Sequence, residues 1–236
     1  MFLKRHKVIG IMGGMGPDAT IDFYNHILSL TPAEKDQDHY PALIYSNPKI
    51  PDRTESIASG ETGTIIEYLQ ETTRILEKGG ADFIAIPCNT AHQFYDEIVS
   101  SVRIPVLHIV EEAVKYIITR LPGVRIVGLL GTTGTLNTGL YQGFLQKNNI
   151  EAITVESKVQ ESLVMKAIYS IKAGKTTENA RELLVKAIAT LPVIAQEVVV
   201  MGCTEIPLAF REPLKATVLI NPTKILAESA LRMCTA

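Results

Sequence analysis

Residues 8–16, with the sequence VIGIMGGMG, and residues 126–134, with the sequence IVGLLGTTG, decide the fold. Each stretch is an apolar run that ends in a glycine-rich turn, and the two begin 118 residues apart in a chain of 236. A second pair of apolar runs ends in a cysteine, FIAIPCNT at 83–90 and VVVMGCTE at 198–205, and these cysteines lie 115 residues apart. Because two landmarks recur at nearly the same spacing, the sequence predicts two similar lobes.

Short apolar runs alternate with amphipathic segments along the whole chain. Strands are expected at 7–12, 42–46, 82–86, 106–109, 125–130, 152–155, 197–201 and 217–220, and helices at 19–30, 64–78, 91–101, 111–120, 138–148, 162–173, 178–191 and 223–233. Strands that are apolar on both faces are typical of parallel sheets covered by helices. The sequence therefore predicts an α/β fold with two similar lobes, each a mostly parallel sheet flanked by helices, and an active site in the cleft between them. We expect the first lobe at 1–109, completed by 210–236, and the second at 110–209.

Composition excludes several classes of protein. Lys and Arg number 23 against 25 Asp and Glu, a net charge of −2 that provides no basic field for a nucleic-acid partner. No apolar run approaches the roughly 18 residues of a membrane span, and the run after the basic residues 4–7 is too short for a signal peptide. We therefore expect a cytoplasmic protein without a membrane partner. The three cysteines do not indicate a disulfide framework, and no spacing of Cys or His indicates a metal.

The glycine turn at 13–16 lets backbone N–H groups approach a ligand closely at the start of a helix. It lacks the G-x-G-x-x-G order of a dinucleotide-binding turn, and the second strand ends in Ser46-Asn47-Pro48 without an acidic residue. A nicotinamide cofactor is therefore disfavoured. Contact with an anion or carboxylate and a tight turn without a ligand both remain open.

Cys88 and Cys203 stand at equivalent places, each at the carboxyl end of a strand and the start of an expected helix. A single cysteine there is often buried core filler, but two in equivalent positions favour function. The positive end of a helix lowers a thiol pKa from about 8.5 by favouring the thiolate. The neighbouring Asn89, Thr90 and Thr204 are donors suited to a carboxylate. We interpret Cys234, two residues from the end of the sequence, as incidental.

Two facing thiols suit the inversion of a carbon stereocentre. One thiolate removes a proton from one face of the carbon, and one thiol donates a proton to the other face. The two groups exchange roles when the reaction runs in the opposite direction. Lobes related by a repeat place two such groups on either side of a substrate.

Four motifs carry a family resemblance: MGGMGPDAT at 12–20, PDRT at 51–54, PCNTAH at 87–92 and GCTE at 202–205. Together they resemble the aspartate/glutamate racemase family, and within it the cofactor-independent aspartate racemases. The resemblance runs essentially from end to end in the same order. It implies two α/β lobes, a two-cysteine mechanism, no pyridoxal phosphate and a homodimer. We also expect no other cofactor and no metal, because no lysine suited to a Schiff base lies near the cysteine segments and no metal-ligand spacing is present.

The resemblance also implies roles for individual residues. Cys88 and Cys203 match the two catalytic cysteines, and Arg53, on a loop bounded by Pro48 and Pro51, matches a residue that contacts the side-chain carboxylate. Lys172 matches a second cation, with Lys166 as the alternative. The loop Asn89, Thr90 and Ala91 matches the segment that holds the α-carboxylate. The full predicted substrate-binding set is Met12, Asp52, Arg53, Thr54, Asn89, Thr90, Ala91, Thr132, Lys172 and Thr204.

The predicted function is interconversion of L- and D-aspartate. In the glutamate racemase branch the second cysteine is typically followed by Thr-His, whereas this chain has Thr204-Glu205. The alternatives are a broad-specificity or glutamate racemase, a cysteine-dependent decarboxylase or isomerase of small dicarboxylates, and a non-catalytic amino-acid-binding protein. Three polar residues allow two interpretations: His92 tunes Cys88 or packs locally, Glu205 polarises the second site or caps its own helix, and His108 faces the cleft or packs structurally.

Overall fold

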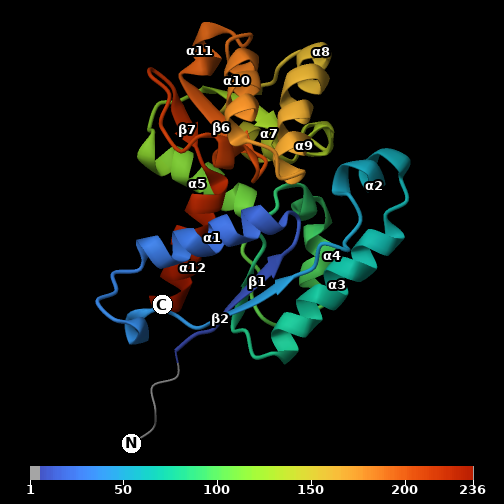
Figure 1. Ribbon diagram of the computed structural model, residues 1–236, viewed down its shortest axis with the longest axis vertical. Helices are drawn as coiled ribbons and strands as arrows, with labels where there is room; N and C mark the ends of the chain where they lie inside the picture. The colour runs from blue at the N-terminus through green and yellow to red at the C-terminus, as the bar shows by residue number, and fades with distance from the viewer. Residues whose placement is uncertain (1–5, 236) are drawn as a thin grey trace, which may run out of the picture.

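A computed structural model describes residues 6–235 of the chain (Figure 1). Its strands form two parallel sheets. The first sheet has the order β2-β1-β3 and consists of β1 (Ile9–Gly13), β2 (Ala42–Ser46) and β3 (Phe83–Ala85). The second has the order β5-β4-β6-β7 and consists of β4 (Ile126–Gly131), β5 (Glu151–Ile153), β6 (Val198–Gly202) and β7 (Val218–Ile220). The predicted α/β architecture with two parallel sheets is confirmed.

Helices cover both sheets. The α-helices are α1 (Pro17–Leu30), α2 (Arg53–Ser59), α3 (Gly63–Lys78), α4 (Tyr95–Val99), α5 (Ile109–Arg120), α6 (Thr133–Asn137), α7 (Leu140–Gln146), α8 (Ser157–Val159), α9 (Lys166–Lys172), α10 (Thr177–Ile188), α11 (Val193–Gln196) and α12 (Pro222–Thr235). Short 3-10 turns lie at η1 (Asp36–Asp38), η2 (Thr90–Phe94) and η4 (Ile206–Ala209), and a π-helical turn, η3 (Gln160–Met165), leads into α9. Repeated βα units thus build each lobe.

The largest apolar core lies between the two sheets. It joins Ile9 and Phe83 of the first sheet to Val127 and Val200 of the second, together with Leu226 of α12, and all five are fully buried. Helix α12 packs against α1 and α5 in this layer (Figure 1). Two further cores lie on the outer faces, one under α3 and one under α9 and α10. Burial on both faces explains why the strands are apolar throughout.

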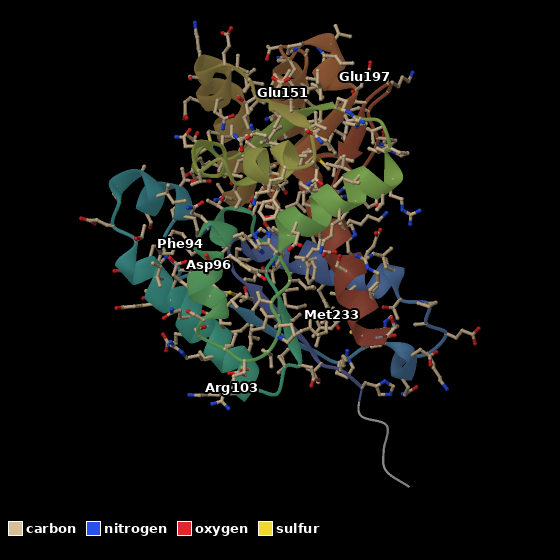
Figure 2. The ribbon with its side chains drawn as sticks, turned by 180° about the vertical axis from the view of Figure 1, so that it is seen from behind. Phe94, Asp96, Arg103, Glu151, Glu197 and Met233 are labelled. Carbon is tan, nitrogen blue, oxygen red and sulfur yellow. The ribbon has the colours of Figure 1, made fainter. Side chains whose placement is uncertain are left out.

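Both sheets direct their carboxyl ends toward the middle of the molecule. Glu151 begins β5 and Glu197 immediately precedes β6, and Figure 2 places both at the end of the second lobe that faces away from the first. Arg103 lies at the opposite end of the molecule, just before the segment in which Val106 pairs in parallel with Ile84. The turns that follow β1, β3, β4 and β6 therefore meet between the lobes, where ligands bind in open α/β sheets.

Some local expectations differ from the structure. The strand expected at 106–109 is reduced to a single bridge at Val106, because His108 caps α5 by accepting a hydrogen bond from the Glu111 N–H at 3.3 Å. The helix expected at 138–148 is observed as the shorter α7, which begins after Gly139, whose φ of 67° favours glycine. The short helix α6, which was not expected, precedes it at Thr133–Asn137.

Two further differences concern the segments around the landmarks. The helix expected at 91–101 begins with the 3-10 turn η2 before α4. Arg53 opens α2 instead of lying on a loop, because the Asp52 carboxylate caps that helix. The lobe boundaries at 109 and 209 stay predictions: β7 joins the second sheet, whereas α12 packs against α1 and α5.

Candidate active site

The two cysteine turns meet at one cavity. Cys88 follows β3 and Cys203 follows β6, and both are buried, with 4% and 5% exposed area. The residues that line this inner cavity are Met15, Asp52, Arg53, Thr54, Cys88, Asn89, Thr90, Thr132, Lys172, Cys203, Thr204 and Glu205. The inner cavity holds about 10 Å³, close to the room of one water. It adjoins an outer cavity of about 290 Å³ that shares Asp52, Arg53, Lys172 and Glu205 with it.

Most of the predicted site residues therefore come together, but two do not. Met12 is fully buried in β1 within the outer core of the first lobe, where its sulfur accepts a weak hydrogen bond from Thr73 at 3.8 Å. Ala91 is also fully buried in that core. Sequence reasoning missed Met15, and it named Glu205 without choosing between its two interpretations.

The glycine turn packs mainly against its own lobe. The Gly14 N–H donates to Thr20 Oγ1 at 2.9 Å, and the Asn47 N–H donates to the Gly13 carbonyl at 3.2 Å. Gly14 has a φ of 93°, and a Cβ there would lie 2.3 Å from the Asn47 backbone. Close chain packing accounts for glycine at this position. Gly14 and Gly16 also line the outer cavity.

The turn after Cys88 presents neutral donors. Asn89 Oδ1 accepts a hydrogen bond from the Tyr141 hydroxyl at 2.6 Å, which fixes the amide. Its Nδ2 atom is buried, and within residues 6–235 it has no hydrogen-bond partner. The Thr90 hydroxyl lies 3.0 Å from the Thr132 hydroxyl and 2.8 Å from that of Thr135, so this turn is bonded directly to the second lobe. A carboxylate could be received by the open Asn89 amide, since buried donors require partners.

The turn after Cys203 presents a carboxylate. The Cys203 thiol donates to Glu205 Oε2 at 2.9 Å, and the Thr204 hydroxyl donates to the same oxygen at 3.4 Å. Burial, reinforced by the charge of Glu205, raises the pKa of the Cys203 thiol well above its ordinary value. The sequence predicted a lowered thiol pKa from the helix position. That prediction is wrong for Cys203, because only a 3-10 turn follows it and desolvation with a like charge outweighs the dipole.

Arg53 is a buried cation held by backbone oxygens. Its side chain is 7% exposed, and Nη1 donates to the Pro51 carbonyl at 2.9 Å while Nη2 donates to the Met15 carbonyl at 3.4 Å. Arg53 Nε is buried without a hydrogen-bond partner among the described residues. The carboxylate of the preceding residue is engaged elsewhere, since Asp52 Oδ1 caps the N–H groups of Thr54 and Glu55.

Lys172 is the cation contributed by the second lobe. Its ammonium lies 3.6 Å from Asp52 Oδ2 and so spans the two lobes at the edge of the inner cavity. Burial opposes its charge, but the nearby Cys203, Glu205 and Asp52 outweigh burial and raise the Lys172 pKa. Lys166, by contrast, is exposed at the start of α9 and does not line the cavity.

His92 supports the Cys88 turn from behind. Its Nε2 accepts from the Ile109 N–H at 3.2 Å, so Nδ1 carries the proton and donates to the Cys88 carbonyl at 2.8 Å. Burial and the neighbouring His108 lower the His92 pKa to about 3, and the ring is neutral. His92 thus contacts the Cys88 backbone and not its thiol. His108 packs between the rings of Tyr95 and Phe144, with centroids at 4.5 and 4.9 Å, as a structural residue.

Two further classes of site, a metal centre and a membrane-spanning helix, are absent from residues 6–235. Within that range, no three His, Cys, Asp or Glu side chains are grouped as a metal-ion site requires. Over the same residues, no helix combines the length and apolar character needed to cross a membrane.

Comparison with known proteins identifies the family. Residues 12–230 match the family described as Asp/Glu/Hydantoin racemase. Over 228 residues the chain is 31% identical to the broad specificity amino-acid racemase RacX of Bacillus subtilis (strain 168), covering 95% of this chain and 96% of that protein.

Solved structures agree in fold. Picrophilus torridus aspartate racemase superposes with a TM-score of 0.84 at 30% identity, over 97% of this chain and 94% of that one. An aspartate racemase homologue from Pyrococcus horikoshii OT3 superposes with a TM-score of 0.76 at 25% identity, over 98% and 100% of the two chains. The chain belongs to the Asp/Glu/hydantoin racemase family and is an amino-acid racemase, which places it among the isomerases.

Proposed function

We propose that this racemase interconverts L- and D-aspartate by a two-base mechanism that uses Cys88 and Cys203 and no cofactor. The observation that carries the proposal is the shared cavity: two buried thiols from equivalent turns of the two lobes line it together with the buried Arg53. The thiols enter from different sheets, so a substrate held between them presents one face to each.

The proposed substrate contacts follow from the open donors. The α-carboxylate would accept from Asn89 Nδ2, which is buried without a partner among the described residues. The side-chain carboxylate would meet Arg53, whose unpartnered Nε and fixed guanidinium favour a planar anion. Lys172 adds a second positive charge at the same edge of the cavity. This arrangement favours a dicarboxylic amino acid over a monocarboxylic one.

The proposed chemistry moves two protons. The thiolate on one side removes the α-proton, and the thiol on the other side donates its proton to the opposite face of the same carbon. After inversion the two sulfur atoms have exchanged protonation states. The inner cavity, at about 10 Å³, must widen to admit an amino acid, and the outer cavity of about 290 Å³ gives a route through residues that both share.

A broad-specificity racemase is the second candidate. The relative that supports it is the broad specificity racemase RacX, at 31% identity over nearly the whole chain. Arg53 and Lys172 argue for a second carboxylate on the substrate, whereas broad specificity requires that neutral side chains also be accepted. The range of amino acids that the protein racemises therefore distinguishes an aspartate racemase from a broad-specificity racemase.

The test is to incubate purified, chelator-dialysed protein separately with L-aspartate, L-glutamate and L-alanine, and to measure the D-enantiomers by chiral chromatography. The proposal expects D-aspartate to form without added pyridoxal phosphate or metal, with much slower reaction of the other two. Comparable turnover of all three would establish the broad-specificity candidate. Light scattering of the same sample tests the homodimer that the family resemblance implies.

A further inference from the structure

Glu205 is a buried acid to which the proposed two-thiol reaction gives no role. Its side chain is 2% exposed, and its Oε2 atom receives the Cys203 thiol at 2.9 Å. Its Oε1 atom is buried with no hydrogen-bond partner within the described part of the chain. A Cβ at Gly16 would lie 3.1 Å from that oxygen, so glycine leaves room beside the carboxylate. A buried carboxyl group beside a thiol, with one oxygen unpartnered, calls for a functional account, because a buried polar atom without a hydrogen bond is costly.

The turn after Cys88 carries no equivalent acid. The residues that follow Cys88 are Asn89 and Thr90, both neutral. Among the described residues that line the inner cavity, the other carboxylate is Asp52, which caps α2 and faces the Lys172 ammonium at 3.6 Å. The carboxylate beside a thiol is therefore a property of one half of the site alone.

We propose that Glu205 holds Cys203 as the thiol at rest, so that Cys203 is the acid of the two-thiol pair and Cys88 is the base. The inference rests on the proposed function for its consequence: the resting enzyme is poised to deprotonate the enantiomer whose α-hydrogen faces Cys88. In that half-reaction the α-proton passes to Cys88 Sγ and the Cys203 proton passes to the α-carbon. The Cys203 thiolate then faces the Glu205 carboxylate, so repulsion favours its reprotonation and the return of Cys88 to thiolate by exchange with water.

The charges around the pair fit this assignment. Lys172 from α9 attracts both Glu205 and a Cys203 thiolate, and Arg53 at the start of α2 adds a further positive charge nearby. Asp52 partly neutralises Lys172. The buried Tyr141 hydroxyl, from α7, stays protonated because burial raises its pKa. Lys172 therefore keeps a thiolate accessible during turnover, while the adjacent Glu205 sets which sulfur holds the proton at rest.

The experiment is site-resolved alkylation of the full chain with iodoacetamide across a pH series from about 6 to 10, read by peptide mass spectrometry. Both thiols line the inner cavity of about 10 Å³, which must widen to admit the reagent. Each thiol is therefore compared with itself across the pH series, and the shape of its profile, not its absolute rate, reports ionisation. In the wild type we expect Cys88 to react at lower pH than Cys203. Glu205→Gln keeps the size and an acceptor but removes the charge, and should raise Cys203 labelling near neutral pH by about tenfold or more.

The controls separate charge from structure. Glu205→Asp keeps a carboxylate and should retain most of the wild-type order, whereas Glu212→Gln, at an exposed position, should leave every profile unchanged. Cys234, whose pKa burial raises to about 11 and which lies outside the cavity, should be labelled equally in wild type and variants at each pH and so serves as the reference between them. The inference is overturned if Cys203 reacts at the same or a lower pH than Cys88 in the wild type, which requires no variant to fold. It is also overturned if Glu205→Gln leaves the Cys203 profile in place. Alkylation needs no turnover, so a lack of racemisation would contradict the proposed function separately.

Discussion

The two cysteine turns share a position in their lobes but differ in chemical surroundings. The turn after β3 places neutral donors beside Cys88, and its backbone is held from behind by a neutral His92 at 2.8 Å. The turn after β6 places the Glu205 carboxylate 2.9 Å from the Cys203 sulfur. The repeat thus supplies two thiols in equivalent places, while the residues that follow each thiol decide what the sulfur does. Geometric symmetry in this family member does not make the two half-sites chemically equal.

Removal of either thiol gives the largest expected effect. We expect Cys88→Ala or Cys203→Ala alone to reduce racemisation by about a thousandfold or more, because general acid–base catalysis contributes about 10²–10⁴ and each face requires its own group. The measurement is the rate of D-aspartate formation by chiral chromatography. Cys234→Ala, outside the cavity, is the matched control and should keep the full rate. Near-normal racemisation by Cys88→Ala or by Cys203→Ala would contradict the proposed two-thiol mechanism.

Removal of the Arg53 guanidinium tests the carboxylate contact of the first lobe. A charge-assisted hydrogen bond contributes about 1.5–3 kcal/mol, so Arg53→Ala should lower kcat/KM for aspartate by about ten- to a hundredfold. Alanine, which lacks a second carboxylate, should lose much less. The exposed Arg103→Ala serves as the control. Equal losses on aspartate and alanine would show that Arg53 supports the fold or the α-carboxylate instead.

Acid should destabilise the support behind Cys88. The His92 pKa is about 3 in the fold and about 6.5 in an unfolded chain, so the unfolded state binds the proton first as pH falls. The stabilisation is present above about pH 6.5 and is lost as pH falls toward 3, by up to about 1.4 kcal/mol per pH unit. Urea titrations at several pH values measure this slope, and NMR should show a His92 ring that does not titrate near neutrality. A ring that protonates near pH 6 would contradict the assignment.

The ion pair between Asp52 and Lys172 gives the smallest effect. Lys172 and the N–H groups of Thr54 and Glu55 outweigh burial and lower the Asp52 pKa, so its stabilisation is present above about pH 3.9 and fades as pH falls below that. Asp52→Asn retains a helix-capping oxygen and should cost less than about 1 kcal/mol at neutral pH, because the pair is partly exposed. In a Lys172→Met background, Asp52→Asn should lower the free energy of unfolding by less still. An equal loss of stability with and without Lys172 would show that the ion pair contributes nothing to stability.

The pattern of apolar residues along the sequence predicted those strands and helices that depend on neighbouring residues alone. Apolar runs bounded by glycine and proline gave strands close to their observed positions, and the repeat predicted two lobes whose cysteine turns converge. The strand predicted at 106–109 is cut short because His108 caps α5, through a hydrogen bond between its side chain and a backbone N–H three residues away. Helix α2 was overlooked although Asp52, its capping residue, was itself singled out as a site residue.

The site was harder to predict where burial determines which side chains reach the cavity and which thiol is protonated. Met12 and Ala91 lie within matching motifs, but each points into packed core and not into the cavity. The raised pKa of Cys203 depends on desolvation and on the fold of a carboxylate back onto the thiol, and neither is visible in a linear sequence. For Glu205 the sequence left two interpretations open, and the tertiary contact with Cys203 separates them.

Solvent isotope incorporation tests the central claim most directly. In deuterated buffer, wild-type protein given L-aspartate should form D-aspartate that carries α-deuterium in every molecule, since the proton delivered to the second face comes from an exchanged thiol. Cys88→Ala and Cys203→Ala should each fail to interconvert the enantiomers, while each remaining thiol still exchanges the α-proton of only one enantiomer, a different one in each variant. Exchange of the same enantiomer in both variants, or D-aspartate that retains the original α-hydrogen, would contradict two thiols acting on opposite faces.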